Sequence, residues 1–398
     1  MFKLDELCEI NEPIVLKNVL CNAQEFSNWK LLNWSLEDLA NKSGDLKLPF
    51  RVGKNIKTIN PQWEVETPIE YKTIKEFLKD VTEPNDLSKW YYFDYKHINQ
   101  WFQEKPEILK SFDWQQFKLE LDGTDSTIWI GSKGAHTNCH RDTYGCNLIA
   151  QIHGRKLWLL FSPECSNSMQ PTRIPYEEST IYSKYNFFTP NELVIEAISN
   201  LSGSVKMIIL EPKDVLFVPK GWWHYVESLD TSLSVNVWLP VKEDCITRLQ
   251  ETLVHLVMNT MGNSIPKTIN QLESNFSESI QFVKTSLKEC QELKKCTLES
   301  LQKRQKLNLI TTDFLDYLKI KYANYIKILP DLTSENINDF ITKNNITKID
   351  DINLKDNIVE TNDFSNSFIS EAVIDAFCHP SVILKISQIL VKKLENNL

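Results

Sequence analysis

Histidine is scarce in this chain of 398 residues, which contains seven, and the surroundings of two of them could hold a metal. His140 and Asp142 are separated by one residue, so on a β-strand their side chains would point to the same side. A His-x-Asp triplet is expected by chance about 0.4 times in a chain of this composition. Taken alone, it is better explained as a hydrogen-bonded surface pair. His224 follows two tryptophans just after a Pro-Lys-Gly turn, and a lone histidine there is more often part of the core.

Taken together, the three residues supply two imidazoles and one carboxylate from two predicted strands. This ligand set is typical of non-haem Fe(II), because it leaves three positions on the metal open. Zinc more often takes a third histidine or a cysteine and completes its shell. We therefore predict that His140, Asp142 and His224 bind Fe(II) and form a catalytic centre.

The open positions on such a centre call for further polar residues nearby. Fe(II) oxygenases of this type usually bind 2-oxoglutarate at two of these positions and O2 at the third. The far carboxylate of that keto acid needs a cation, and Lys156 lies 14 residues after Asp142 on a predicted strand. Thr137 can add a hydroxyl, and Asn147 and Asn236 lie on the strands that follow the ligands. Without the metal ligands, Lys156 would be read as an exposed strand lysine.

These residues must be positioned by short strands. Between about 120 and 240, apolar runs alternate with Gly and Pro turn signals, which is typical of a sandwich or barrel. Before this zone, residues 71–79 and 97–110 have a helical pattern. After about 241 the apolar spacing is helical again, ending in an amphipathic helix at 381–396. The predicted strands are Thr127–Ile130, Leu157–Phe161, Lys206–Leu210, Val215–Val218 and Ser232–Leu239.

Several stretches share their pattern with a known family, namely Gly134–Phe161, Thr172–Ser179, Val215–Ser228 and Ser234–Trp238. They resemble the JmjC-domain oxygenases. Within that family the chain is similar to the small hydroxylase branch, which includes the factor-inhibiting-HIF-like enzymes, and above all to JmjC proteins associated with small heat-shock proteins. The resemblance covers about residues 10–260 and is most specific from 127 to 240.

The resemblance implies an α+β fold with a mainly β core. An eight-stranded double-stranded β-helix (a cupin barrel) would occupy 121–260, with an N-terminal buttress of helices and strands at 1–120 and a helical region at 261–398. The implied iron ligands are those already predicted, and Lys156 and Thr137 would hold the distal carboxylate of 2-oxoglutarate. The other implied pocket residues are Asn147, Asn236, Trp129 and Tyr92.

The implied activity is that of a 2-oxoglutarate-dependent dioxygenase that uses Fe(II) and O2. Hydroxylation of a protein side chain is the favoured reaction, with a small heat-shock protein as a partner. One alternative is a non-catalytic JmjC adaptor that binds a small heat-shock protein and modulates its chaperone function. Another is a tRNA-base hydroxylase, which a net charge of −9 disfavours. The amphipathic stretch 245–258 fits either a homodimer contact or an ordinary packed helix.

The sequence also indicates the cellular compartment in which the protein is expected. The first ten residues carry four charged side chains and no apolar run typical of a signal peptide. No run of 18 apolar residues predicts a membrane-spanning helix. The nine cysteines form no CxxC pair, which suggests reduced thiols. We therefore expect a cytoplasmic or nuclear protein with no membrane partner.

Overall fold

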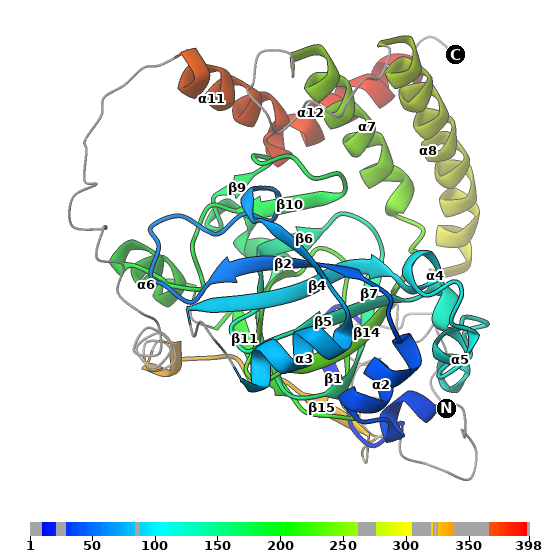
Figure 1. Ribbon diagram of the computed structural model, residues 1–398. Coiled ribbons are helices and arrows are strands. Elements are labelled where there is room, and N and C mark those ends of the chain that lie inside the picture. The colour runs from blue at the N-terminus through cyan, green and yellow to red at the C-terminus, as the bar shows by residue number, and fades with distance from the viewer. Residues whose placement is uncertain are drawn as a thin grey trace.

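The computed structural model contains two β-sheets that face each other, with helices on the N-terminal side and a group of C-terminal helices beside them (Figure 1). It describes residues 10–20, 29–83, 88–201, 203–261, 276–304 and 366–395, together with 320, 323, 325–333, 335–337 and 339. The cysteines whose side chains are described are all free thiols, namely Cys139, Cys146, Cys165, Cys245, Cys290 and Cys378.

The smaller sheet has six strands in the order β11-β8-β13-β6-β10-β9. All of its strand pairs are antiparallel. Its strands are β6 (His136–Asp142), β8 (Lys156–Phe161), β9 (Pro171–Thr172), β10 (Thr180–Ser183), β11 (Val205–Leu210) and β13 (Trp223–Ser228).

The larger sheet has nine strands in the order β15-β1-β12-β7-β14-β5-β4-β2-β3. Strands from the predicted N-terminal region therefore belong to the same sheet as those of the predicted barrel. Its strands are β1 (Ile14–Leu16), β2 (Leu48–Lys54), β3 (Ile69–Lys72), β4 (Lys89–His97), β5 (Thr127–Gly131), β7 (Cys146–His153), β12 (Val215–Val218), β14 (Ser232–Leu239) and β15 (Ile326–Ile328).

Four strands of each sheet form the barrel, β12-β7-β14-β5 on one side and β11-β8-β13-β6 on the other. This is the double-stranded β-helix that the resemblance implied, and it confirms the α+β class with a mainly β core. The apolar runs predicted the strands well, because β8 and β12 are buried along their whole length. A strand covered on both faces has no polar alternation to show.

The N-terminal helices cover the outer face of the larger sheet, where a large apolar cluster includes Phe50 stacked on Phe77 with ring centroids 4.7 Å apart. Two capping boxes start these helices, Ser35 with Asp38 and Thr73 with Glu76. The short elements here are α2 (Leu36–Ser43), α3 (Ile74–Thr82), α4 (Ile98–Trp101), α5 (Pro106–Leu109), η1 (Lys30–Asn33), η2 (Glu64–Glu66), η3 (Gln115–Phe117) and η4 (Gly123–Asp125).

Two helical predictions in this region need correction. The pattern at 71–79 begins inside β3, and α3 starts only at Ile74 because the Thr73 cap fixes its first turn. The run at 97–110 is not one helix but two four-residue helices, and Pro106 begins the second. His97 is the last residue of β4, not part of a helix.

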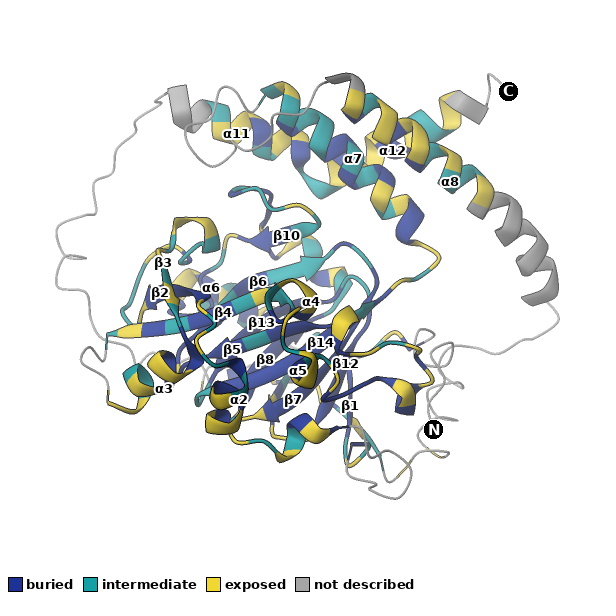
Figure 2. Ribbon diagram, turned by 45° about the vertical axis from the view of Figure 1, so that its right-hand side comes forward, coloured by how far each residue is buried: buried dark blue, intermediate teal, exposed yellow. Residues whose placement is uncertain are grey.

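The C-terminal helices form a separate apolar cluster around Leu253, Val254 and Met258. Helix α7 (Asp244–Met261) packs against α8 (Phe276–Arg304), α11 (Asn366–Cys378) and α12 (Pro380–Glu395). Helix α12 confirms the helix predicted at 381–396. Figure 2 shows the buried barrel strands in contrast to the partly exposed faces of these helices.

No single helix in the described ranges is long and apolar enough to cross a membrane, although α11 and α12 together, bent by 52°, satisfy the same length and composition criteria.

Two further elements complete the fold. Helix α6 (Glu192–Ser199) covers the outer face of the smaller sheet through Val194 and Ile198. The turn η5 (Pro163–Asn167) follows β8.

Candidate functional site

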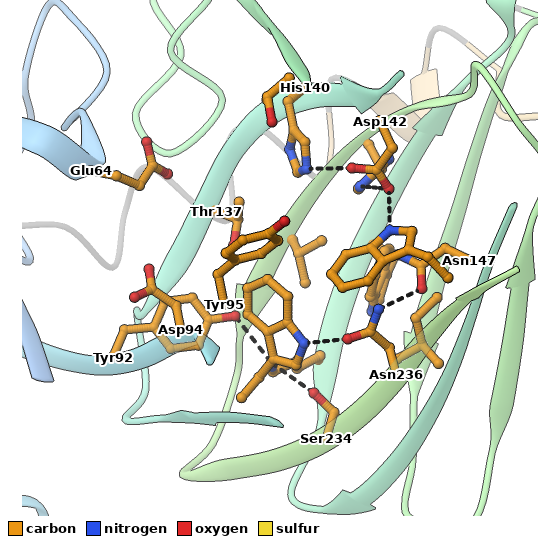
Figure 3. A pocket seen from close by; sticks show the side chains of 18 of the residues that line it. Glu64, Tyr92, Asp94, Tyr95, Thr137, His140, Asp142, Asn147, Ser234 and Asn236 are labelled. Carbon is orange, nitrogen blue, oxygen red and sulfur yellow. Dashed lines mark hydrogen bonds and ion pairs between the residues drawn. The ribbon is translucent and has the colours of Figure 1, made fainter. Parts of the chain in front are cut away.

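One pocket inside the barrel mouth collects every residue that the sequence singled out (Figure 3). It contains about 690 Å³ of empty space, counting its open mouth. Six predicted residues come from β6, β8, β7 and β13, and three from β4, β5 and β14. The nine are His140, Asp142, His224, Lys156, Thr137, Asn147, Asn236, Trp129 and Tyr92.

The three predicted ligands meet at one point. His140 and Asp142 lie on β6, and His224 lies directly opposite His140 on β13. His140 Nε2 is 3.6 Å from Asp142 Oδ1, and His224 Nε2 is 4.0 Å from Asp142 Oδ2. The ligand atoms all lie within 4.8 Å of one another, so a single cation could contact the three.

Backbone carbonyls orient both imidazoles. His140 Nδ1 is 2.8 Å from the Asn138 carbonyl, and His224 Nδ1 is 3.1 Å from the Trp222 carbonyl. With Nδ1–H donating to a carbonyl, each ring turns the Nε2 lone pair toward Asp142, which is the usual arrangement of metal-binding histidines. On the other side, Trp238 Nε1 donates to Asp142 Oδ2 at 3.0 Å.

The electrostatics of this group fit a cation. Burial, and next the neighbouring His140, lower the pKa of His224 to about 4. The ring is therefore neutral near pH 7, as a metal ligand must be. Two imidazoles and a carboxylate give the donor set that suits Fe(II) and leaves part of the metal shell open.

A β-bulge explains why Thr137 and His140 share the pocket although they are three residues apart. In the pairing of β6 with β13, His140 lies opposite His224 and Thr137 lies opposite Val226. A step of three residues along β6 thus corresponds to a step of two residues along β13. The extra residue shifts the alternation of the strand, so that both side chains point inward.

Lys156 marks the deep end of the pocket and is 2% exposed. Its Nζ donates to Ser234 Oγ at 3.0 Å and to Tyr92 Oη at 3.2 Å, and it lies 5.8 Å from the Trp129 ring centroid. No carboxylate forms an ion pair with it within the described part of the chain. Burial lowers the pKa of Lys156 to about 7. A buried cation without a counter-ion is costly, so this end of the pocket suits an anion.

Neutral groups line the side of the pocket formed by the larger sheet. Trp129 Nε1 donates to Asn236 Oδ1 at 2.7 Å, and Asn236 Nδ2 donates to Asn147 Oδ1 at 2.8 Å. Both amides are buried. The chain of hydrogen bonds fixes which way each amide points, as Figure 3 shows.

The rim of the pocket, defined here as Glu64, Asp94, Tyr95 and Glu177, is acidic and partly exposed. Arg51 is its main counter-charge, with Nη2 2.8 Å from Asp94 and 3.9 Å from Glu64. Burial raises the pKa of the Glu177 carboxyl, which accepts a hydrogen bond from Tyr182.

Sequence reasoning missed the rim and part of the pocket lining. Ser234 and Trp238 could have been found, because they alternate with Asn236 along β14 and must face the same side. Glu64 and Glu177 had no such signal, since one lies in a 3-10 turn and the other in a loop. Two further histidines lie close to the ligand strand in sequence, His136 as the first residue of β6 and His153 as the last residue of β7, and neither lines the pocket.

Comparison with known proteins matches residues 1–244 to the family described as the Cupin-like domain. The HSPB1-associated protein 1 homolog of Danio rerio is 34% identical over 331 residues, covering 78% of this chain and 71% of that protein. The human HSPB1-associated protein 1 is 35% identical over 269 residues, covering 65% of this chain and 54% of that protein. The chain thus spans about half the length of its human relative.

A more distant similarity reaches a second group of proteins. Lysine-specific demethylase 8 of Xenopus tropicalis is 26% identical over 234 residues, which cover 57% of this chain and 48% of that protein. A JmjC domain-containing protein of Dictyostelium discoideum is 36% identical over 110 residues, 28% of this chain and 42% of that protein.

Proposed function

This chain belongs to the Cupin-like family of JmjC domains, and we propose that it is an Fe(II)- and 2-oxoglutarate-dependent oxygenase that hydroxylates a protein side chain. One observation carries the proposal. A His-Asp-His group and a buried lysine, which has hydroxyls but no carboxylate as hydrogen-bond partners within the described ranges, lie in the same pocket. The first suits a divalent metal, the second suits an anion, and a keto acid chelated to the metal would satisfy both.

Each residue then has a role that follows from its contacts. His140, Asp142 and His224 would hold Fe(II), and Lys156 would pair with the distal carboxylate of 2-oxoglutarate. Thr137, which hydrogen-bonds to Tyr92, would add a hydroxyl. Bound iron and 2-oxoglutarate supply, with O2, the oxidising power that places oxygen on a substrate C–H bond while the keto acid becomes succinate and CO2.

The uncharged residues of the pocket would orient the cosubstrate and shield it from water. Asn147 and Asn236, fixed by Trp129, would position the near end of the cosubstrate. Trp158 and Ile149 line the pocket and belong to the apolar cluster inside the barrel. This cluster draws on both sheets and limits water in the pocket, and a dry pocket strengthens the attraction between Lys156 and a carboxylate.

The rim supports a protein substrate rather than a nucleic acid. Glu64, Asp94 and Glu177 surround the approach to the proposed iron, and a phosphate backbone would be repelled by these groups. The tRNA-base alternative is therefore disfavoured by the rim as well as by the net charge of −9.

The relatives add a partner to the proposal. Those most like this chain are named for an association with HSPB1, and we propose a small heat-shock protein as a partner or substrate. The same names also favour the adaptor alternative, in which the domain binds such a protein without catalysis. A cytoplasmic or nuclear location, and a homodimer through the C-terminal helices, stay predictions.

Metal and cosubstrate binding separates the oxygenase from the adaptor. Under anaerobic conditions, Fe(II) plus 2-oxoglutarate should give a weak visible charge-transfer band with the full chain. His140→Ala and Asp142→Ala should lose the band and the succinate formed in air, whereas His153→Ala, a histidine outside the pocket, should keep both. No band and no metal uptake by the unaltered chain would favour the adaptor.

The substrate can be sought with the same variants. Asp142→Ala protein, incubated with cell extract, should retain its substrate, and the unaltered enzyme should then add the mass of one oxygen atom to it. Mass spectrometry of the captured material distinguishes a protein from a tRNA. Capture of a small heat-shock protein that gains no oxygen would point to the adaptor.

A further inference from the structure

The segment 171–184 forms one wall of the pocket and lies against the strand that carries two of the proposed iron ligands. Its strand β10 pairs with β6, so that Thr180 lies opposite Asp142 and Tyr182 lies opposite His140. Thr180 and Tyr182 themselves line the pocket. A shift of this segment would therefore change both the wall and the support of the ligand strand.

A buried ion pair ties the segment to α7. Arg173 Nη1 donates to Glu251 Oε2 at 2.6 Å, and Nη2 donates to the other carboxylate oxygen. The two side chains are 2% and 4% exposed. The same Nη1 donates to the Thr180 carbonyl at 3.2 Å. One guanidinium thus holds the helix and the start of β10 together.

A second tie joins the two ends of the segment to α11. Asp375 accepts hydrogen bonds from Thr172 Oγ1 at 2.8 Å and from Lys184 Nζ at 2.5 Å. Between them, Ile174 and Tyr176 pack against the apolar cluster of the C-terminal helices. In Figure 1, β9 and β10 lie on the side of the barrel that faces α11 and α12.

The burial and geometry of the Arg173–Glu251 ion pair suggest that it positions the segment rather than stabilises the fold. A buried ion pair gives little net stability, because the cost of removing two charges from water offsets most of their attraction. Its particular property is a fixed bidentate geometry. The pair also joins two regions, since Arg173 lies within the match to the family and Glu251 lies beyond its end at residue 244.

We propose that Arg173 and Glu251 are positioning residues, which make the C-terminal helices part of the pocket by holding the 171–184 wall in place. The proposal rests on the proposed function only in taking this pocket as the iron site. Access to His140 and Asp142 then depends on α7 and α11, although neither helix supplies a residue to the pocket.

Hydrogen exchange of the full chain without metal tests the tie independently of catalysis. Arg173→Gln should speed exchange of the amides of Thr180–Ser183 at least about tenfold, with β8 and β11 unchanged. Arg248→Gln is the matched control, because Arg248 lies on α7 like Glu251 but forms an exposed pair with Glu289 of α8, and its loss should leave the segment unchanged. Unchanged exchange in Arg173→Gln, or an equal increase throughout the barrel, would overturn the proposal.

Should Arg173→Gln not fold, Asp375→Asn breaks the partly exposed tie instead and should speed hydrogen exchange of the same amides about threefold. Unchanged exchange in that variant would equally overturn the proposal.

The rate of iron release provides a second measurement. A bipyridine chelator should strip Fe(II) from Arg173→Gln about tenfold faster than from the unaltered chain, with the same iron content at equilibrium. Equal stripping rates would contradict a role in access. If the unaltered chain binds no iron, the proposed function fails, while the exchange result still decides the tie.

Discussion

The two sheets of the barrel supply different chemistry to one pocket. The smaller sheet carries the groups that bear or compensate charge, with three proposed iron ligands on β6 and β13 and Lys156 on β8. The larger sheet contributes a wall of neutral groups, the amides Asn147 and Asn236 and the aromatic ring of Trp129, with Asp94 of β4 at its rim. The proposed metal ligands and the buried cation therefore lie on one wall, and the hydrogen-bonded amides on the other.

The difference shows in how each wall is held. The neutral groups are hydrogen-bond partners of one another, since Trp129, Asn236 and Asn147 form a continuous chain of hydrogen bonds. Among the residues that the structure describes, Lys156 instead has two hydroxyl partners and no carboxylate partner. The charged wall is thus complete only with ligands, and substitutions on it should affect binding most.

The largest expected effect is at the cation of the smaller sheet. Lys156→Met should weaken 2-oxoglutarate binding about 100-fold, because a charge-assisted pair is lost in a dry pocket. It should also raise the midpoint of thermal unfolding, since a buried cation without a counter-ion is removed. Calorimetric titration and thermal denaturation measure the two effects.

Another buried lysine on the same sheet provides the control for this prediction. Lys206 is paired with Asp331 at 2.9 Å and donates to the Leu329 carbonyl. Lys206→Met should lower the unfolding midpoint and leave 2-oxoglutarate binding unchanged. If both variants lost stability alike, Lys156 would be an ordinary structural lysine and the contrast between the sheets would be wrong.

The next effect concerns the point where the two walls meet. Trp238→Phe removes the N–H that orients Asp142, and loss of such a second contact should weaken Fe(II) binding about tenfold. Trp158→Phe is the matched control, because the buried Trp158 N–H has no hydrogen-bond partner in the part of the chain that the structure describes. Equal Fe(II) affinity of the two variants, measured by competition with a chelator, would show that the larger sheet does not act on the metal.

A smaller effect is expected from pH. Burial lowers the pKa of Lys156 to about 7, so the free protein holds this proton below pH 7 and loses it above. An anion favours the charged lysine, and its binding should therefore take up a proton above pH 7. The dissociation constant of 2-oxoglutarate should rise about fivefold from pH 7 to 8. A flat profile over this range would mean that Lys156 stays charged without ligand.

The sequence predicted the barrel better than its edges. Runs such as Leu157–Phe161 are buried on both faces and therefore stand out, whereas β10 and the short helices α4 and α5 depend on pairing and packing with distant residues. The spacing on β6 and the likeness to the JmjC family pointed to the same strands, and the nine predicted residues do line one pocket. Their roles in binding stay predictions.

Contacts distant in sequence could not be predicted. The hydroxyl partners of Lys156 lie 64 and 78 residues away in the sequence. The bulge that turns Thr137 inward depends on the register with β13. No local pattern indicates which loop Glu251 meets, because Arg173 is 78 residues from it.

The smallest effect should follow a change confined to the neutral wall. Asn236→Ala breaks both hydrogen bonds of the buried amide chain and leaves the Trp129 N–H without its acceptor. Each such bond contributes about 1 kcal/mol, so 2-oxoglutarate should bind no more than about fivefold more weakly, with Fe(II) affinity unchanged. Ser232 lies on the same strand as Asn236 but outside the pocket, and Ser232→Ala, which loses one buried hydrogen bond to Ser228 of β13, should reduce stability alone. A loss of iron in Asn236→Ala would mean that the neutral wall also sets the geometry of the ligands, because amide packing on β14 would then be coupled to β6 across the barrel.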